Sequence, residues 1–125
     1  MTGNALILQP GRKLSPEQSL AAAILTQAFS DMSPGNSSID HQATRDRNDA
    51  RTAMVFLTTT YGEMAKWRNE LCDYLHLDGD VLAERVRMIL NGDLPWPDVR
   101  ETKKRTNDDY ADAARSVWRD LKKAA

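Results

Sequence analysis

Apolar side chains recur along this chain at three- and four-residue intervals, which is the spacing of amphipathic helices. Between residues 16 and 32 one such stripe consists of Leu20, Ile24, Leu25, Ala28, Phe29 and Met32. The segment starts at Ser15-Pro16-Glu17-Gln18, where serine can cap free backbone N–H groups and glutamine completes a capping box. The pattern therefore predicts a first helix over about 16–32.

Four further stripes follow, and each predicts another helix. We expect a second helix over about 43–60 and a third over 63–75; the fourth is capped by Asp78 and ends at Asn91-Gly92, and the last begins at Thr106–Asp109. The predicted inward positions are, in chain order, Ala50, Ala53, Met54 and Leu57; Met64, Trp67, Leu71 and Leu75; Val81, Leu82, Val86, Ile89 and Leu90; and Tyr110, Ala114, Val117, Trp118 and Leu121. Strands are not predicted anywhere.

The segments between these stripes contain helix-breaking residues. Ser33-Pro-Gly-Asn-Ser-Ser38 favours turns, so residues 33–42 are predicted as a mobile connector, and two prolines keep Leu94–Pro97 out of helical geometry. Residues 1–14 carry no helical pattern and are predicted as a flexible N-terminal segment. The expected fold is all-α: one domain over 15–125, a compact bundle of four or five short helices containing a helix-turn-helix-like pair.

The charge and cysteine content narrow the function classes. A formal net charge of -1 gives no overall attraction to nucleic acid or an anionic membrane. The apolar run Ala5 to Leu8 is too short for a signal sequence or a membrane span, so no membrane partner is expected. A single cysteine, Cys72, rules out an internal disulfide and favours a reducing, cytoplasmic location.

Residue sets that could support catalysis or bind a metal are sparse. Cys72 and His76 lie four residues apart and could form half of a zinc site, but no second pair accompanies them. Cys72 is better interpreted as a small buried residue and His76 as a helix-end residue. Asp78-Gly79-Asp80 lacks the ligand spacing of a calcium loop, and the glycines do not form a phosphate-binding loop. We therefore predict a non-enzymatic protein without metal or cofactor.

A local basic strip is the main candidate for partner binding. The segment Arg100–Arg105 places four cations within six residues, namely Arg100, Lys103, Lys104 and Arg105, and the last helix adds Arg115 and Arg119. Such a strip can meet phosphate or an acidic protein surface, although nearby aspartates could make it an ordinary solvated face. Trp96, framed by prolines, either fills a space inside the domain or anchors a partner.

The third and fourth helices offer an alternative, because their short connection has the proportions of a helix-turn-helix. Lys66, Arg87 and Asn91 would then contact nucleic acid. However, residues 61–92 carry four basic and six acidic side chains, a net charge of -2 that opposes attraction to phosphate. A helical hairpin that packs in the core is the competing interpretation.

A resemblance adds a biological setting. Trp67, Cys72, the turn Leu77-Asp78-Gly79-Asp80 and the following Arg85-Val86 form a pattern that extends over about residues 49–90. In this pattern the chain resembles small helical proteins encoded by phages and prophages. Proteins of that kind are mostly regulators or accessory factors, so the resemblance implies binding to a macromolecule and no chemistry.

Together these observations predict a small regulatory adaptor, related to phage proteins, that binds a protein of the transcription or nucleic-acid machinery. Direct DNA binding through residues 66–91 is the alternative. A homodimer is left open, because the apolar stripes could exceed what one small bundle can bury.

Overall fold

The computed structural model describes residues 13–35, 39–97 and 106–124. Within these ranges the chain forms helices only: α1 (Pro16–Asp31), α2 (Asp40–Thr58), α3 (Glu63–Tyr74), α4 (Gly79–Asn91) and α5 (Asn107–Ala124). The all-α prediction is confirmed. No described helix combines the length and apolar character that crossing a membrane requires.

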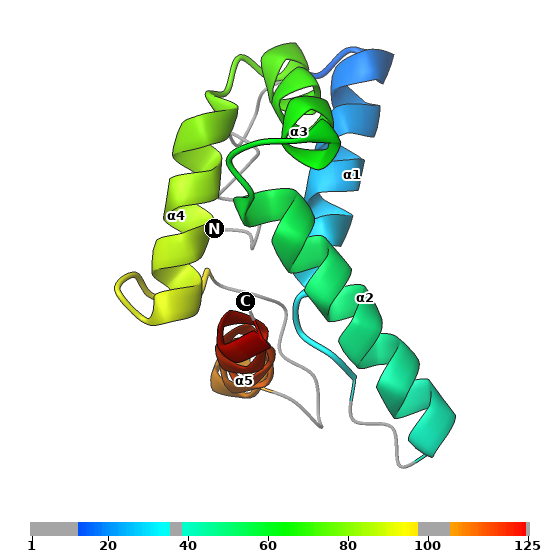
Figure 1. Cartoon of the computed structure of the whole chain (residues 1–125). Coiled ribbons are helices and arrows are strands. Elements are labelled where there is room, and N and C mark those ends of the chain that lie inside the picture. The colour runs from blue at the N-terminus through cyan, green and yellow to red at the C-terminus, as the bar shows by residue number, and fades with distance from the viewer. Residues whose placement is uncertain (1–12, 36–38, 98–105, 125) are drawn as a thin grey trace.

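Helix α2 is the centre of the bundle, because it packs against each of the other four helices. Figure 1 shows it running diagonally through the molecule, with α1 and α3 on one side, α4 on the other and α5 seen end-on below. The first turns of α2 extend beyond the other helices (Figure 1). The middle and C-terminal turns of α2 therefore carry its contribution to the shared core, which consists of Ala50, Ala53, Met54, Phe56 and Leu57.

The helix boundaries follow local capping chemistry, as the sequence indicates. Ser15 and Gln18 form a reciprocal capping box at α1, and the Asp78 carboxylate accepts hydrogen bonds from the first backbone N–H groups of α4. Gly92 ends α4 in the left-handed conformation, with φ of 90°. Before α5, the Thr106 hydroxyl accepts from the backbone N–H of Asp109, while the Asp109 carboxylate accepts from that of Thr106.

Two connecting segments differ from the predictions. Helix α2 begins at Asp40, so residues 40–42 of the predicted 33–42 connector are helical. The same helix ends at Thr58, before the predicted end at 60, because Thr59 is already extended and Gly62, with φ of 91°, serves as the N-cap of α3. Of the predicted flexible N-terminal segment, residues 1–12 lie outside the described residues, and Leu14 packs against the core.

Three predicted core positions are wrong. Leu20 is 64% exposed, Val81 is 50% exposed and Trp67 is 49% exposed. Each continues an apolar stripe at helical spacing, but none of the five described helices covers that part of the stripe. Trp118 is buried in the core as predicted.

Candidate functional site

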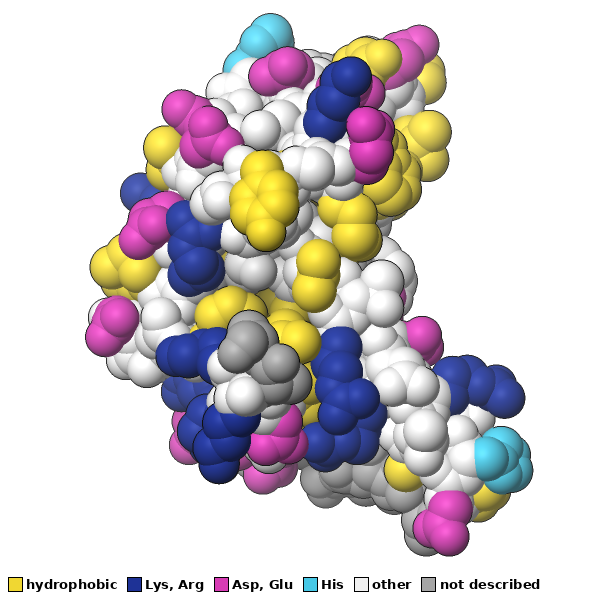
Figure 2. Space-filling model, in the orientation of Figure 1, with side chains coloured by type: hydrophobic (Ala, Val, Ile, Leu, Met, Phe, Trp, Pro, Cys, Tyr) yellow, Lys and Arg dark blue, Asp and Glu magenta, His cyan; other side chains and the backbone are white. Residues whose placement is uncertain are grey.

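An apolar groove lies between α1, α2 and α3. Its volume is about 540 Å³, and it is lined by Ala23, Ile24, Gln27, Ala28, Asp31, Asp49, Thr52, Ala53, Phe56, Met64 and Trp67. Figure 2 shows hydrophobic side chains gathered along the right-hand margin, beside α1 and α3. The groove contains no lysine or arginine among its lining residues.

The apolar end of the groove is formed by aromatic and aliphatic side chains from different helices. Trp67 of α3 packs its ring against Phe56 of α2, with ring centroids 5.1 Å apart and planes inclined by 52°. Phe56 is buried, whereas about half of Trp67 remains accessible. A tryptophan held in one orientation and still half exposed is typical of the anchors that dominate protein interfaces.

The opposite end of the groove is acidic. Asp31 and Asp49 also line a smaller adjoining pocket, to which Asp46 contributes a third carboxylate. Asp31 accepts a hydrogen bond from Gln27 at 2.8 Å and Asp46 accepts one from Gln42 at 2.9 Å, both within their own helices. The ion pairs seen among the described residues involve other carboxylates, those of Asp120, Asp80 and Glu84.

Asp31 also lies at an electrostatically unfavourable position. It occupies the last turn of α1, where the partial negative charge of the helix C-terminus collects, and this turn contains no basic residue. A cation bound there would offset both the charge of the Asp31 carboxylate and the partial negative charge of the helix C-terminus.

The predicted basic strip is only partly described. Arg100, Lys103, Lys104 and Arg105 lie outside the described residues. Arg119 is exposed on α5, and its role in partner binding stays a prediction. Arg115 instead points inward, and donates to the backbone carbonyls of Ile89 at 3.0 Å and Leu94 at 3.3 Å. The Arg115 guanidinium therefore holds the end of α4 and the following loop against α5, and its role in partner binding stays a prediction.

Trp96 is buried inside the domain. It is 7% exposed, lies 5.1 Å from the ring of Phe29 and has the Arg115 guanidinium 6.0 Å from its ring centroid. Of the two predicted roles, filling a space inside the domain fits these contacts, and anchoring a partner does not. Its indole N–H has no hydrogen-bond partner among the described residues.

The predicted nucleic-acid surface on α3 and α4 is largely used within the protein. Lys66 is exposed, but Arg87 donates to the Thr58 carbonyl and to the Glu84 carboxylate, the latter at 2.7 Å. The Asn91 side-chain oxygen accepts from the Trp118 indole at 2.8 Å and from Lys122 at 3.1 Å. Arg87 and Asn91 thus hold α4 to α2 and α5, and their role as nucleic-acid contacts stays a prediction.

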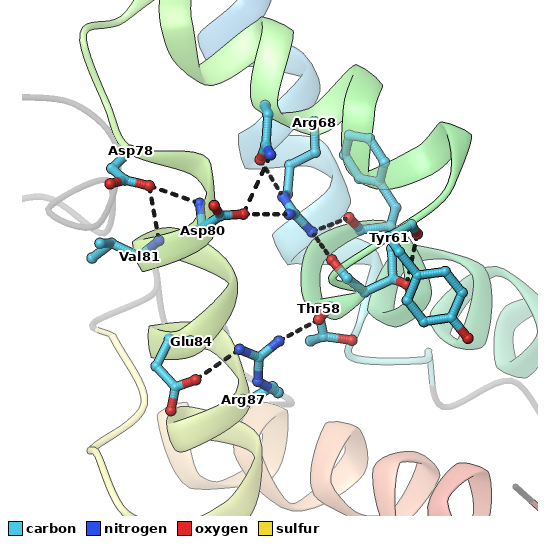
Figure 3. Close-up of polar contacts among 11 residues, drawn as sticks. Thr58, Tyr61, Arg68, Asp78, Asp80, Val81, Glu84 and Arg87 are labelled. Atoms are coloured by element: carbon cyan, nitrogen blue, oxygen red, sulfur yellow. Dashed lines mark hydrogen bonds and ion pairs between the residues drawn. The ribbon is translucent and has the colours of Figure 1, made fainter.

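Arg68 is a structurally central residue that the sequence analysis missed. Its side chain is fully buried and donates to the carbonyls of Phe56 at 3.2 Å and Thr59 at 2.6 Å, which belong to the C-terminal end of α2 (Figure 3). Its second terminal nitrogen has no hydrogen-bond partner in the described chain and lies 3.8 Å from the Asp80 carboxylate. Burial is the main cause that lowers the pKa of Arg68, while Cys72 and Asp80 oppose this shift.

Arg68 and Arg87 together form a two-arginine cap on α2. They place positive charge at the carbonyls of Phe56, Thr58 and Thr59, where the helix leaves acceptors without partners (Figure 3). We therefore assign both arginines a role in joining α2, α3 and α4.

Cys72 belongs to the core, as the interpretation as a small buried residue predicts. It is fully buried, and burial raises the pKa of its thiol to about 11. His76 is exposed and adopts a positive φ of 58° at the end of α3. Among the described residues no group of three or more histidine, cysteine or carboxylate side chains is placed to hold a metal ion.

A sequence signal for the groove exists, although it is subtle. Asp31 follows Ile24 and Ala28 at positions i+7 and i+3, and Asp49 precedes Ala53 and Phe56 by four and seven residues. Each aspartate therefore continues an apolar stripe where a core helix would normally carry another apolar residue.

No protein-family model, no curated protein and no solved structure matches this chain. The resemblance to small phage proteins therefore stays a prediction, and the groove is assessed on its own geometry.

Proposed function

We propose that this chain is a non-catalytic adaptor that binds a protein partner in the groove between α1, α2 and α3. The observation that carries the proposal is the half-exposed Trp67, held against Phe56 beside an open volume of about 540 Å³. Aromatic side chains in a concave apolar site supply most of the binding free energy in many protein interfaces.

The biological setting is part of the same proposal. The resemblance over residues 49–90 supports a phage-related regulator that acts on the transcription or nucleic-acid machinery, and the single buried Cys72 fits a cytoplasmic protein. Arg119 remains available as a secondary contact on α5. Direct DNA binding through α3 and α4 receives less support, because Arg87 and Asn91 are engaged inside the domain.

Site-specific photo-crosslinking in bacterial cells tests the proposal. A photoreactive phenylalanine analogue replaces Thr52, an exposed residue of α2 that lines the groove, and in a matched control it replaces Thr44, which is exposed on the same helix outside the groove. We expect a discrete protein adduct from position 52 and none from position 44. Equal labelling at both positions, or a specific adduct only from an analogue at Arg119, would contradict binding in the groove.

A further inference from the structure

The groove is polarised from end to end. Phe56, Met64 and Trp67 form an apolar end, and Asp31 and Asp49 form an acidic end that continues into the pocket with Asp46. A partner that fills the whole groove therefore needs an apolar side chain at one end and a cationic side chain at the other.

We propose that the partner segment is an amphipathic helix that places an aliphatic or aromatic side chain against Trp67 and a lysine or arginine between Asp31 and Asp49. This inference rests on the proposed function, and specifies the partner's chemistry. A helix is favoured because the groove is bounded by three helices, and the described chain contains no strand whose edge could pair with an extended peptide.

Charge complementarity supports the cationic residue. The lining contains two carboxylates and no basic side chain, and neither carboxylate takes part in an ion pair within the described residues. Asp31 also carries its charge at the negative end of α1. A guanidinium or ammonium group at this end would neutralise two carboxylates for which residues 13–35, 39–97 and 106–124 provide no ion pair.

The length of the groove sets the spacing in the partner. Ile24 at the apolar end and Asp31 at the acidic end are seven residues apart on α1, which corresponds to about 10 Å along a helix. A partner helix that lies along the groove therefore needs its apolar anchor and its cation about seven residues apart, or two helical turns.

Selection from a displayed library of random 12-residue peptides tests the inference with the full chain as bait. Affinities of enriched peptides are then measured for two test variants and their two matched controls. Thr52→Gln extends a neutral side chain over the groove, with Thr44→Gln as the matched control on α2. Asp31→Asn with Asp49→Asn removes the acidic end, with Asp73→Asn and Asp112→Asn, both exposed, as a control of equal charge change.

We expect enriched peptides to pair an apolar residue with Lys or Arg about seven positions away, and to bind the Asp31/Asp49 double variant about tenfold more weakly than the control. Thr52→Gln should weaken binding and Thr44→Gln should not. Peptides that depend on Thr52 but carry no basic preference and ignore the aspartates would overturn the inference and leave the proposed function standing. Absence of any Thr52-dependent peptide would overturn both. A protein that dimerises in sedimentation, and whose dimer is lost in Thr52→Gln, would assign the groove to a second copy and also overturn the inference.

Discussion

Trp67 and Trp96 each pack against a phenylalanine at the same centroid distance of 5.1 Å, yet their surroundings differ. Around Trp96, polar side chains bridge different elements: Arg115 of α5 binds carbonyls at the end of α4, and Asn91 binds Trp118. In the groove beside Trp67, the side-chain hydrogen bonds that the polar lining residues Gln27, Asp31 and Thr52 form in the described chain stay within one helix, from Gln27 to Asp31 and from Thr52 to the Asn48 carbonyl.

This difference separates a sealed region from an open one. Polar groups that bridge elements close the structure around Trp96, whereas the groove beside Trp67 has an apolar floor and carboxylates free of ion pairs within the described residues. The burial of these two tryptophans therefore depends on which neighbouring polar groups form hydrogen bonds between helices, and less on the apolar pattern of each tryptophan's own segment.

The largest expected effect comes from truncating the sealed tryptophan. Trp96→Ala should lower the free energy of unfolding by about 3–5 kcal/mol, because it leaves a cavity beside Phe29 and Arg115. Trp67→Ala should cost only about 1 kcal/mol, since half of that side chain is already in water. Chemical denaturation measures both, and equal or reversed costs would refute the distinction between the two regions.

The second effect concerns the buried arginine that joins α2 to α3. Arg68→Ala removes the donor to the carbonyls of Phe56 and Thr59 and should destabilise the fold by about 3 kcal/mol. Lys66→Ala, at an exposed position of the same helix, is the control and should change stability by less than about 0.5 kcal/mol. Similar midpoints for both variants in urea would show that the cap on α2 contributes little.

A third effect follows from the raised pKa of Cys72. The thiol has a pKa of about 11 in the folded protein against an ordinary value of 9.0, so the unfolded chain loses this proton first as pH rises. The protonated Cys72 thiol contributes fully to the free energy of unfolding below pH 9. About 2 kcal/mol of this free energy should be lost between pH 9 and 11. The Cys72→Ala variant should lack this loss. If the free energy of unfolding depends on pH equally in both proteins, the thiol is not shielded from water.

The smallest expected change in the free energy of unfolding comes from a substitution in the groove. Asp31→Asn removes a negative charge from the C-terminal turn of α1 and should stabilise the free protein by about 0.3–1 kcal/mol. Asp112→Asn on α5 is the matched control, with no comparable gain expected. Thermal unfolding measures the difference, and a loss of stability in Asp31→Asn would mean that its carboxylate serves the fold.

The sequence alone predicts the helices well, because their ends depend on local chemistry. The capping roles of Ser15, Asp78 and Thr106 and the helix stop at Gly92 require only a few neighbouring residues. These signals lie within one turn of each boundary, so the pattern locates the start of α1, both ends of α4 and the start of α5 to within two residues.

The groove and the buried arginine could not be obtained in the same way. Arg68 is buried because the C-terminal end of α2 packs against α3. Trp67 is exposed because none of the described helices covers its side of the groove. Both are properties of how helices are placed relative to one another. Periodicity alone therefore assigns Trp67 to the core and gives no reason to place a charged residue such as Arg68 there.

The most direct test of the account uses the three tryptophans as internal reporters. In an ¹⁵N-labelled sample each indole N–H gives its own NMR signal, which is assigned by single substitutions and followed while a 12-residue helical peptide is added that carries a leucine and an arginine seven positions apart. We expect the Trp67 signal to shift progressively while the signals of Trp96 and Trp118 stay in place, since of the three tryptophans only Trp67 lines the groove. A shift at Trp118 or Trp96 with Trp67 unmoved would contradict it.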